Sequence, residues 1–194
     1  GLIAGWIIGS QQAGLRPGMS APVAATAPAS APAGSQGAAP AAPVLDDNRV
    51  KALTSVVEQQ PANAQARVDL GNTYFDAERY QDAIKWYGEA MKLTPNDVNV
   101  STDLAVAYYY TNQPDLALKQ FDASLKIDPK HTKTLLNLGI VRAFGKQDLA
   151  GAEQAWQQVM QLDPNGPEGQ AAKRALDSLK SAHPGGTTPT TAAK

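Results

Sequence analysis

The residues best suited to acid–base or metal chemistry are few in this chain and lie far apart. Its 194 residues include two histidines, His131 and His183, and no cysteine. Without cysteine there is no disulfide, no thiolate zinc site and no cysteine nucleophile. No partner stands at a spacing that would place it beside either histidine, and the sequence has neither a glycine-rich phosphate loop nor a GxSxG motif. We therefore predict that the chain is not an enzyme and holds no cofactor or metal.

The charged side chains are balanced and mixed along the sequence. Lys and Arg total 17 and Asp and Glu total 18, which leaves a net charge of −1. A nucleic-acid surface needs a clustered basic face, so we predict no nucleic-acid partner. Most acidic residues fall at positions expected to face water, where a hydrated surface is their ordinary role.

One pattern recurs three times between Ala64 and Pro164 and organises the chain. It consists of Leu followed by a small residue, then Tyr, Ala, an aromatic residue and Pro. The third copy keeps the step of the first two at Leu138, but its Pro164 comes one residue late, so we place a single inserted residue near positions 148–151. The first two copies lie 34 residues apart at every match: Leu70, Tyr74, Ala83, Tyr87 and Pro95 correspond to Leu104, Tyr108, Ala117, Phe121 and Pro129.

A period of about 34 with these residue types in this order resembles the tetratricopeptide repeat (TPR) family. The resemblance implies an all-α fold, a right-handed α-solenoid of three TPR helix pairs with flanking capping helices. The chain departs from the family pattern at Arg142, where a Tyr is usual. It also departs at the bulky first position, which holds Arg67, Ser101 and Leu135.

Neither helix of a pair can hide its apolar face alone, so we expect the pattern residues to form the core. Small residues would let the two backbones approach, with Gly71 against Ala83 and Gly139 against Ala152. The aromatic residue of each copy would then fill the space toward the next repeat: Tyr87, Phe121 and Trp156.

Composition divides the rest of the chain. Residues 10–45 are almost wholly Ala, Pro, Gly, Ser, Thr and Gln, and lack the large apolar residues that offset ordering entropy. We predict a truncated membrane anchor or signal remnant at 1–9, a disordered linker at 10–45, a TPR domain at 46–182 and a disordered tail at 183–194. Within the domain we expect a capping helix at 46–60, repeats at 64–97, 98–131 and 132–166, and a C-terminal helix at 167–182.

Residues 1–9 are uncharged and apolar except for three glycines. Nine residues are too few to cross a bilayer, which needs about 20, but they suit the far end of a membrane helix. A remnant of a secretory signal, or an apolar stretch without a role, are the alternatives. Arg16 alone is basic before Arg49, which favours translocation. We expect a bacterial membrane-anchored TPR protein with its repeats in the periplasm, or alternatively at the cytoplasmic face.

The resemblance also implies that the first helix of each repeat lines a concave groove. An extended peptide would lie there, because aromatic and paired polar groups are the usual anchors of such a surface. The predicted groove residues are Asp69, Asn72, Phe75, Asp103, Val106, Tyr109, Tyr110, Lys133, Asn137, Ile140 and Phe144.

One subtype of the family grips the C-terminal carboxylate of chaperones with Lys and Asn at set places. Asn72 and Lys133 match that clamp. Val68 stands where a Lys is needed, Asp103 where an Asn is needed and Asn137 where an Arg is needed. Because Asp103 would repel a carboxylate, we reject a chaperone tail as the ligand.

These features predict a membrane-tethered TPR scaffold or adaptor that binds protein or peptide segments in its groove. A first alternative is an assembly factor resembling the membrane-anchored repeat subunits of cytochrome c maturation, which hold unfolded polypeptide. A second is a structural scaffold that self-assembles into a homo-oligomer. An enzyme is the least favoured reading.

Overall fold

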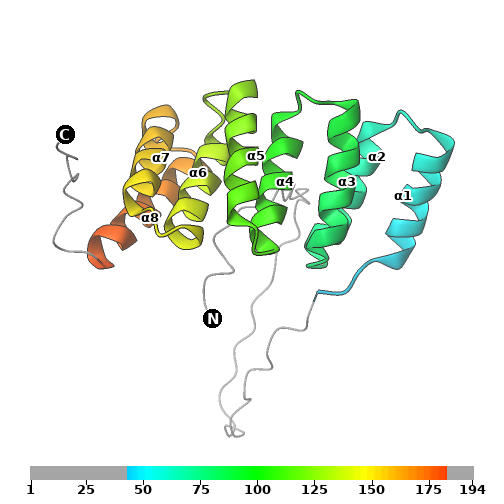
Figure 1. Ribbon diagram of the computed structural model, residues 1–194, viewed down its shortest axis with the longest axis horizontal. Helices are drawn as coiled ribbons and strands as arrows, with labels where there is room; N and C mark the ends of the chain where they lie inside the picture. The colour runs from blue at the N-terminus through cyan, green and yellow to red at the C-terminus, as the bar shows by residue number, and fades with distance from the viewer. Residues whose placement is uncertain (1–42, 183–194) are drawn as a thin grey trace, which may run out of the picture.

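A computed structural model describes residues 43–182, and every regular element in that range is helical. The helices stand side by side in a row, each antiparallel to the next along the chain (Figure 1). The predicted all-α solenoid of TPR helix pairs is confirmed. The elements are α1 (Asp47–Gln59), α2 (Ala64–Asp76), α3 (Tyr80–Leu93), α4 (Val98–Tyr110), α5 (Pro114–Ile127), α6 (Thr132–Ile140), the π-helical turn η1 (Val141–Gly145), α7 (Leu149–Leu162) and α8 (Pro167–Ala182).

Local chemistry explains where the helices begin. A side-chain oxygen accepts a hydrogen bond from the first turn at four N-caps, which are Asp46, Asn63, Asp97 and Asp148. Each cap satisfies a backbone N–H that the helix cannot pair internally, which stabilises the helix by about 1 kcal/mol.

The aromatic residue of each second helix packs inside its own repeat. Tyr87, Phe121 and Trp156 are at most 2% exposed. A Cβ on Gly71 would overlap the Tyr87 ring, and a Cβ on Gly139 would overlap the Trp156 indole. The glycines therefore make room for the aromatic ring rather than for the alanines we expected. Each ring also packs toward the next repeat, as expected, because it shares a buried cluster with the first helix that follows: Tyr87 with Leu104, Phe121 with Leu138 and Trp156 with Leu176.

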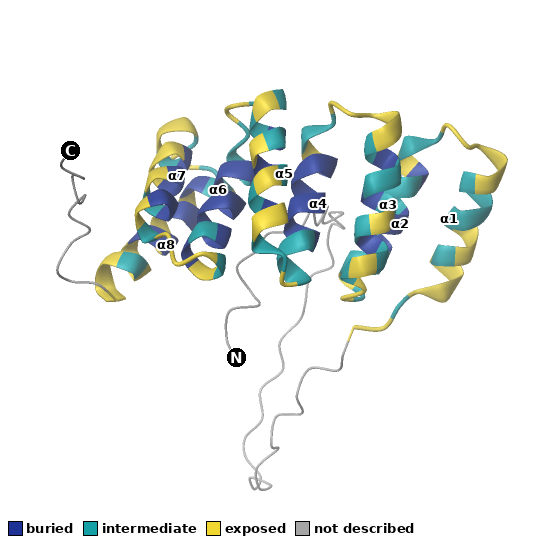
Figure 2. Cartoon of the chain, in the orientation of Figure 1, coloured by how far each residue is buried: buried dark blue, intermediate teal, exposed yellow. Residues whose placement is uncertain are grey.

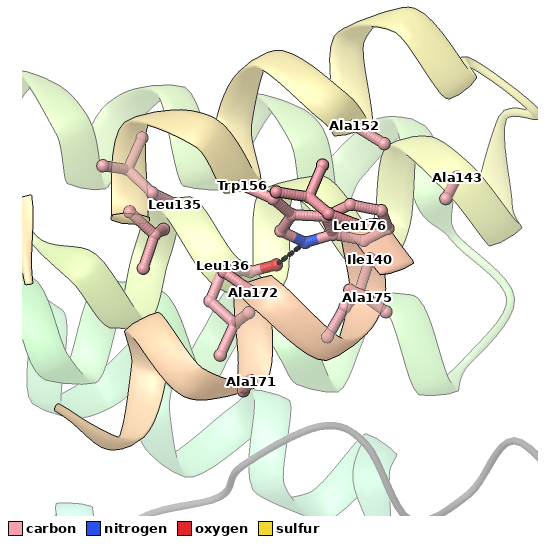
Figure 3. Packing of buried hydrophobic residues seen from close by; sticks show 11 residues of the cluster. Leu135, Leu136, Ile140, Ala143, Ala152, Trp156, Ala171, Ala172, Ala175 and Leu176 are labelled. Atoms are coloured by element: carbon pink, nitrogen blue, oxygen red, sulfur yellow. Dashed lines mark hydrogen bonds between the residues drawn. The ribbon is translucent and has the colours of Figure 1, made fainter. Parts of the chain in front are cut away.

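The third pair shows this core at close range (Figure 3). The Trp156 indole N–H donates to the backbone oxygen of Leu136 at 3.1 Å. This bond satisfies the one polar group of a fully enclosed ring. Around it lie Leu135, Ile140, Ala152, Ala172 and Leu176.

The inserted residue lies earlier than the sequence suggested. Each turn between paired helices holds one residue with a left-handed backbone: Glu78, Asn112 and Gln147. The first two are 34 residues apart and the last two 35, so the shift precedes position 147. The turn η1 absorbs it, since Lys146 N–H donates to Val141 O, five residues back, at 3.2 Å. One extra residue inside a helix widens it into a π-turn.

The two ends of the row differ. Helix α1 has no buried residue, whereas α8 buries Ala171, Ala172, Ala175 and Leu176 against the third pair. Figure 2 shows buried residues along the middle of the row and none on α1.

The predicted membrane localisation is wrong for this part of the chain. Between residues 43 and 182, no helix is both long and apolar enough to cross a bilayer. The longest, α8, has 16 residues and carries charge along its length, whereas a span needs about 20 mostly apolar residues. The anchor itself was assigned to residues 1–9, which lie outside the described residues, as do most of the linker and the tail.

Candidate functional site

The predicted groove positions belong to the first helices α2, α4 and α6, whose shared surface we call the first-helix face. Ring contacts join α2 to α4, with Phe75 and Tyr110 centroids 5.6 Å apart. Polar contacts join α4 to α6, with the Thr102 and Thr134 hydroxyl oxygens 2.6 Å apart. The face therefore has two junctions, which differ in chemistry.

At the junction of α4 and α6, the polar residues pair with each other. Lys133 Nζ donates to Asp103 Oδ1 at 2.7 Å, and both side chains are nearly buried, at 13% and 11% exposed. Burial raises the pKa of Asp103, while the charge of Lys133 and its hydrogen bond act in the opposite direction. Asp103 and Lys133, which were both predicted to contact a ligand, therefore form an ion pair with each other inside the protein.

Helix α8 covers the α6 part of the face. Ile140 packs with Ala172 and Leu176 of α8 in one buried cluster. Asn137 is fully buried, and its Nδ2 donates to the backbone oxygen of Lys133 at 3.0 Å. Its Oδ1 has no hydrogen-bond partner among residues 43–182. Val106 is also buried, in the core shared by the second and third pairs. These three predicted groove residues are not on the surface.

In the first repeat, the polar residues also bond within the fold. The Tyr87 hydroxyl donates to Asn72 Oδ1 at 2.8 Å, which ties the two helices of the pair together. Gln65 Nε2 donates to Asp69 Oδ1 at 2.9 Å along α2. The Asn72 side-chain oxygen therefore already accepts a hydrogen bond within the fold.

At the junction of α2 and α4, four rings form what we call the aromatic cluster: Phe75, Tyr80, Tyr109 and Tyr110. Tyr80 stacks on Tyr110 with centroids 4.5 Å apart and ring planes 10° apart. Phe75 meets Tyr80 edge-on at 5.1 Å, and Tyr109 lies 6.1 Å from Tyr110. All four side chains are only partly buried. Of the predicted groove residues, the structure thus brings three together in an accessible place.

Sequence reasoning missed Tyr80, the fourth member of the cluster. It begins α3, and the equivalent first residues of the later second helices are Pro114 and Leu149. A search for recurring residue types therefore passes over it. Its place beside the turn at residues 77–79, facing the end of α2, was the signal that could have found it.

Phe144 lies apart from the cluster and is 53% exposed. The extra residue of η1 lies between Arg142 and Lys146, so the constant step of 34 that pairs Phe144 with Tyr110 does not hold there. Tyr109 lies against Gly145, where an added Cβ would come 3.1 Å from its ring. The cluster therefore continues toward η1 through Tyr109.

The tyrosine hydroxyls of the cluster are available hydrogen-bond donors. Within the described range, Tyr80, Tyr109 and Tyr110 make no side-chain hydrogen bond to the protein, in contrast to Tyr87. Burial and the charge of Glu78 raise the pKa of Tyr80 to about 12, and burial also raises the pKa of Tyr109 and Tyr110. All three hydroxyls therefore stay protonated near neutral pH.

Comparison with known families agrees with this architecture. One TPR model matches residues 71–112 and a second tetratricopeptide repeat model matches residues 102–167. Together the two matches cover residues 71–167, half of the chain. The chain belongs to the tetratricopeptide repeat family. Neither matching model describes a catalytic domain.

The TPR region is also similar to individual proteins. Hsp70-Hsp90 organizing protein 3 of Arabidopsis thaliana is 28% identical over 147 residues, which are 73% of this chain and 26% of that protein. The chain therefore spans about a quarter of the length of this curated relative.

The fold also resembles solved structures, among them a domain of RPAP3 and MamA. The first TPR of Spaghetti (RPAP3), bound to an HSP90 peptide, has a TM-score of 0.56 and 27% identity, and the match covers 61% of this chain and 91% of that one. MamA has a TM-score of 0.58 and 18% identity, with 70% and 80% of the two chains covered. At that identity MamA supports the fold alone.

Proposed function

We propose that this TPR domain binds an extended protein or peptide segment on its first-helix face, chiefly through the aromatic cluster. The single observation that carries the proposal is the set of four contacting, partly exposed rings, with three hydroxyls that no group between residues 43 and 182 uses. Such rings combine a large apolar contact with a polar edge, which makes Tyr a frequent anchor at interfaces.

The relatives support a peptide as the class of ligand. The RPAP3 domain, 27% identical, was solved with an HSP90 peptide. In this chain, however, the two residues that match a carboxylate clamp are engaged internally: Lys133 by Asp103 and Asn72 by Tyr87. The proposed ligand is therefore bound by contacts with its side chains and internal backbone, rather than by capture of an acidic C-terminus.

The two alternative functions have less support. Head-to-tail self-assembly would place a second copy on the outer face of α8. There Lys173 and Arg174 stand where α6 carries Leu138 and Gly139, so this surface lacks the small and apolar residues that pair two helices. No contact in the described residues favours a role in cytochrome maturation, and both alternatives remain predictions.

The proposal is tested by selecting random linear peptides on the full chain and measuring their affinities for variants. We expect Tyr110→Ala to weaken binding at least tenfold, because the change removes the ring shared by three contacts. The matched control is Trp86→Ala, a partly buried aromatic on α3 outside the cluster. Equal affinities for both variants, with both folds intact by circular dichroism, would refute the proposal.

A further inference from the structure

The chain enters the solenoid at the edge that carries the aromatic cluster. Helices α1 and α2 are antiparallel and joined by four residues, so the start of α1 and the end of α2 lie along the same edge of the row (Figure 1). Phe75 and Tyr80 flank the turn between α2 and α3 at that edge. Whatever precedes residue 43 is therefore attached to the edge where the cluster lies.

The chemistry of the cluster indicates what it would hold. Two parallel stacked rings, one edge-on neighbour (Phe75) and one tilted neighbour (Tyr109) offer apolar faces, and three hydroxyls offer donors. The complementary ligand has flat apolar rings and exposed carbonyl oxygens. A proline-rich segment has both, because proline lacks an N–H and its polyproline II backbone leaves every carbonyl unpaired. Aromatic-lined surfaces are the usual receptors of such segments.

Such a segment lies next to α1 in the chain itself. Residues 17–43 carry no charged side chain. This stretch also lacks Phe, Tyr, Trp, Leu and Ile, so its prolines are its main rigid apolar groups. Its six prolines are Pro17, Pro22, Pro28, Pro32, Pro40 and Pro43.

The segment is long enough to reach the cluster. Neighbouring helices pack about 8–10 Å apart, so α4 lies within about 30 Å of α1. A flexible chain of this length has an average end-to-end distance of roughly 30 Å. Tethering at such a length gives an effective concentration on the order of 1 mM, which suffices for a weak proline-rich contact.

From these observations we infer that residues 17–43 bind the aromatic cluster of their own chain and compete there with an external ligand. The inference rests on the proposed function, because it assigns a built-in competitor to the same site. Since the segment is uncharged, the contact does not depend on salt. It sets a threshold: only a partner that binds more tightly than the tethered segment occupies the cluster.

The test uses the full chain and a fluorescent synthetic peptide of residues 17–43. The wild-type chain is compared with a proline variant, in which all six prolines are replaced by Ala. Two further chains carry Tyr110→Ala or the control Trp86→Ala in addition to the six proline replacements. We expect the proline variant to bind the peptide about tenfold more tightly than wild type, because its site is vacant. Adding Tyr110→Ala should abolish this binding, and adding Trp86→Ala should leave it unchanged.

Equal affinity of the wild-type and proline-variant chains for the peptide, or no binding to the proline variant, overturns the inference. A peptide whose prolines are replaced by Ala must also bind more weakly, since equal binding would remove the role of the prolines. These failures are distinct from failure of the proposed function. If library-selected peptides still require Tyr110 while the 17–43 peptide does not bind, the proposed function stands and the inference does not.

Discussion

Where α2 meets α4, the first-helix face is aromatic and partly open. Where α4 meets α6, it is polar and covered. The same repeat position shows the change: Asp69 is partly exposed, Asp103 is 8% exposed and Asn137 is fully buried. The three positions have the same place in their helices, so the difference comes from what lies beside them. Neighbouring elements, and not the repeat position, decide whether a polar residue stays accessible or is buried in the fold.

The largest effect is expected in the covered region. Lys133→Ala leaves the Asp103 carboxylate buried without its partner, which typically costs about 3–5 kcal/mol. We expect a loss of this size in the free energy of unfolding, measured by chemical denaturation. The control is Lys92→Ala, which breaks an exposed pair with Glu89 and should leave stability unchanged. Similar losses in both variants would mean that the Asp103–Lys133 pair is not enclosed.

The cores inside the helix pairs should not differ between the two regions, because in the first and third pairs a glycine packs against a buried aromatic ring. Gly71→Ala and Gly139→Ala each place a methyl group against a buried ring, and overpacking of this kind costs about 1–3 kcal/mol. We expect both to lower the melting temperature. Gly88→Ala is the matched control, since nothing lies within 4 Å of its added Cβ, and it should stabilise the fold by about 0.5–1 kcal/mol. If Gly88→Ala destabilised as much as the other two, helix packing would not be the cause.

The open junction should tolerate change better. Tyr110→Ala removes ring contacts worth about 0.5–1.5 kcal/mol each in a partly exposed place, so we expect a loss of about 1–2 kcal/mol in unfolding free energy, smaller than that of Lys133→Ala. Phe144→Ala, at an exposed ring, should change stability by less than about 0.5 kcal/mol. A loss for Tyr110→Ala as large as that for Lys133→Ala would make the cluster a structural core and weaken the case for a binding surface.

The smallest effect concerns pH at the covered junction. His131 Nδ1 lies 2.7 Å from the Thr134 hydroxyl, and burial lowers the pKa of His131 below its ordinary value near 6.5. The unfolded chain therefore binds a proton that the folded chain resists, so stability is full above pH 6.5 and falls as the pH drops below it. The contribution of His131 protonation to stability is measured by comparing the unfolding free energies of wild type and His131→Gln between pH 5 and 7.5. A difference that stays constant over that range would contradict it.

The candidate site was only partly predictable. Phe75, Tyr109 and Tyr110 could be located because their positions follow the repeat. A search by repeat position passes over Tyr80, because it has no counterpart in the other repeats. Asn137 and Ile140 were expected on the surface, but α8 covers them. The position of Phe144 in the repeat could not be read from the sequence, since a constant step cannot locate an insertion that a helix absorbs as a π-turn.

The sequence by itself determined that the chain forms helix pairs, because spacing of apolar residues, capping side chains and prolines act over a few residues. It also determined that an aromatic ring packs in each pair. Only the tertiary structure decided which first-helix residues remain accessible. Burial and hydrogen bonding depend on side chains 15 to 30 residues away, such as Tyr87 beside Asn72 and Lys133 beside Asp103, and no local pattern fixes those contacts.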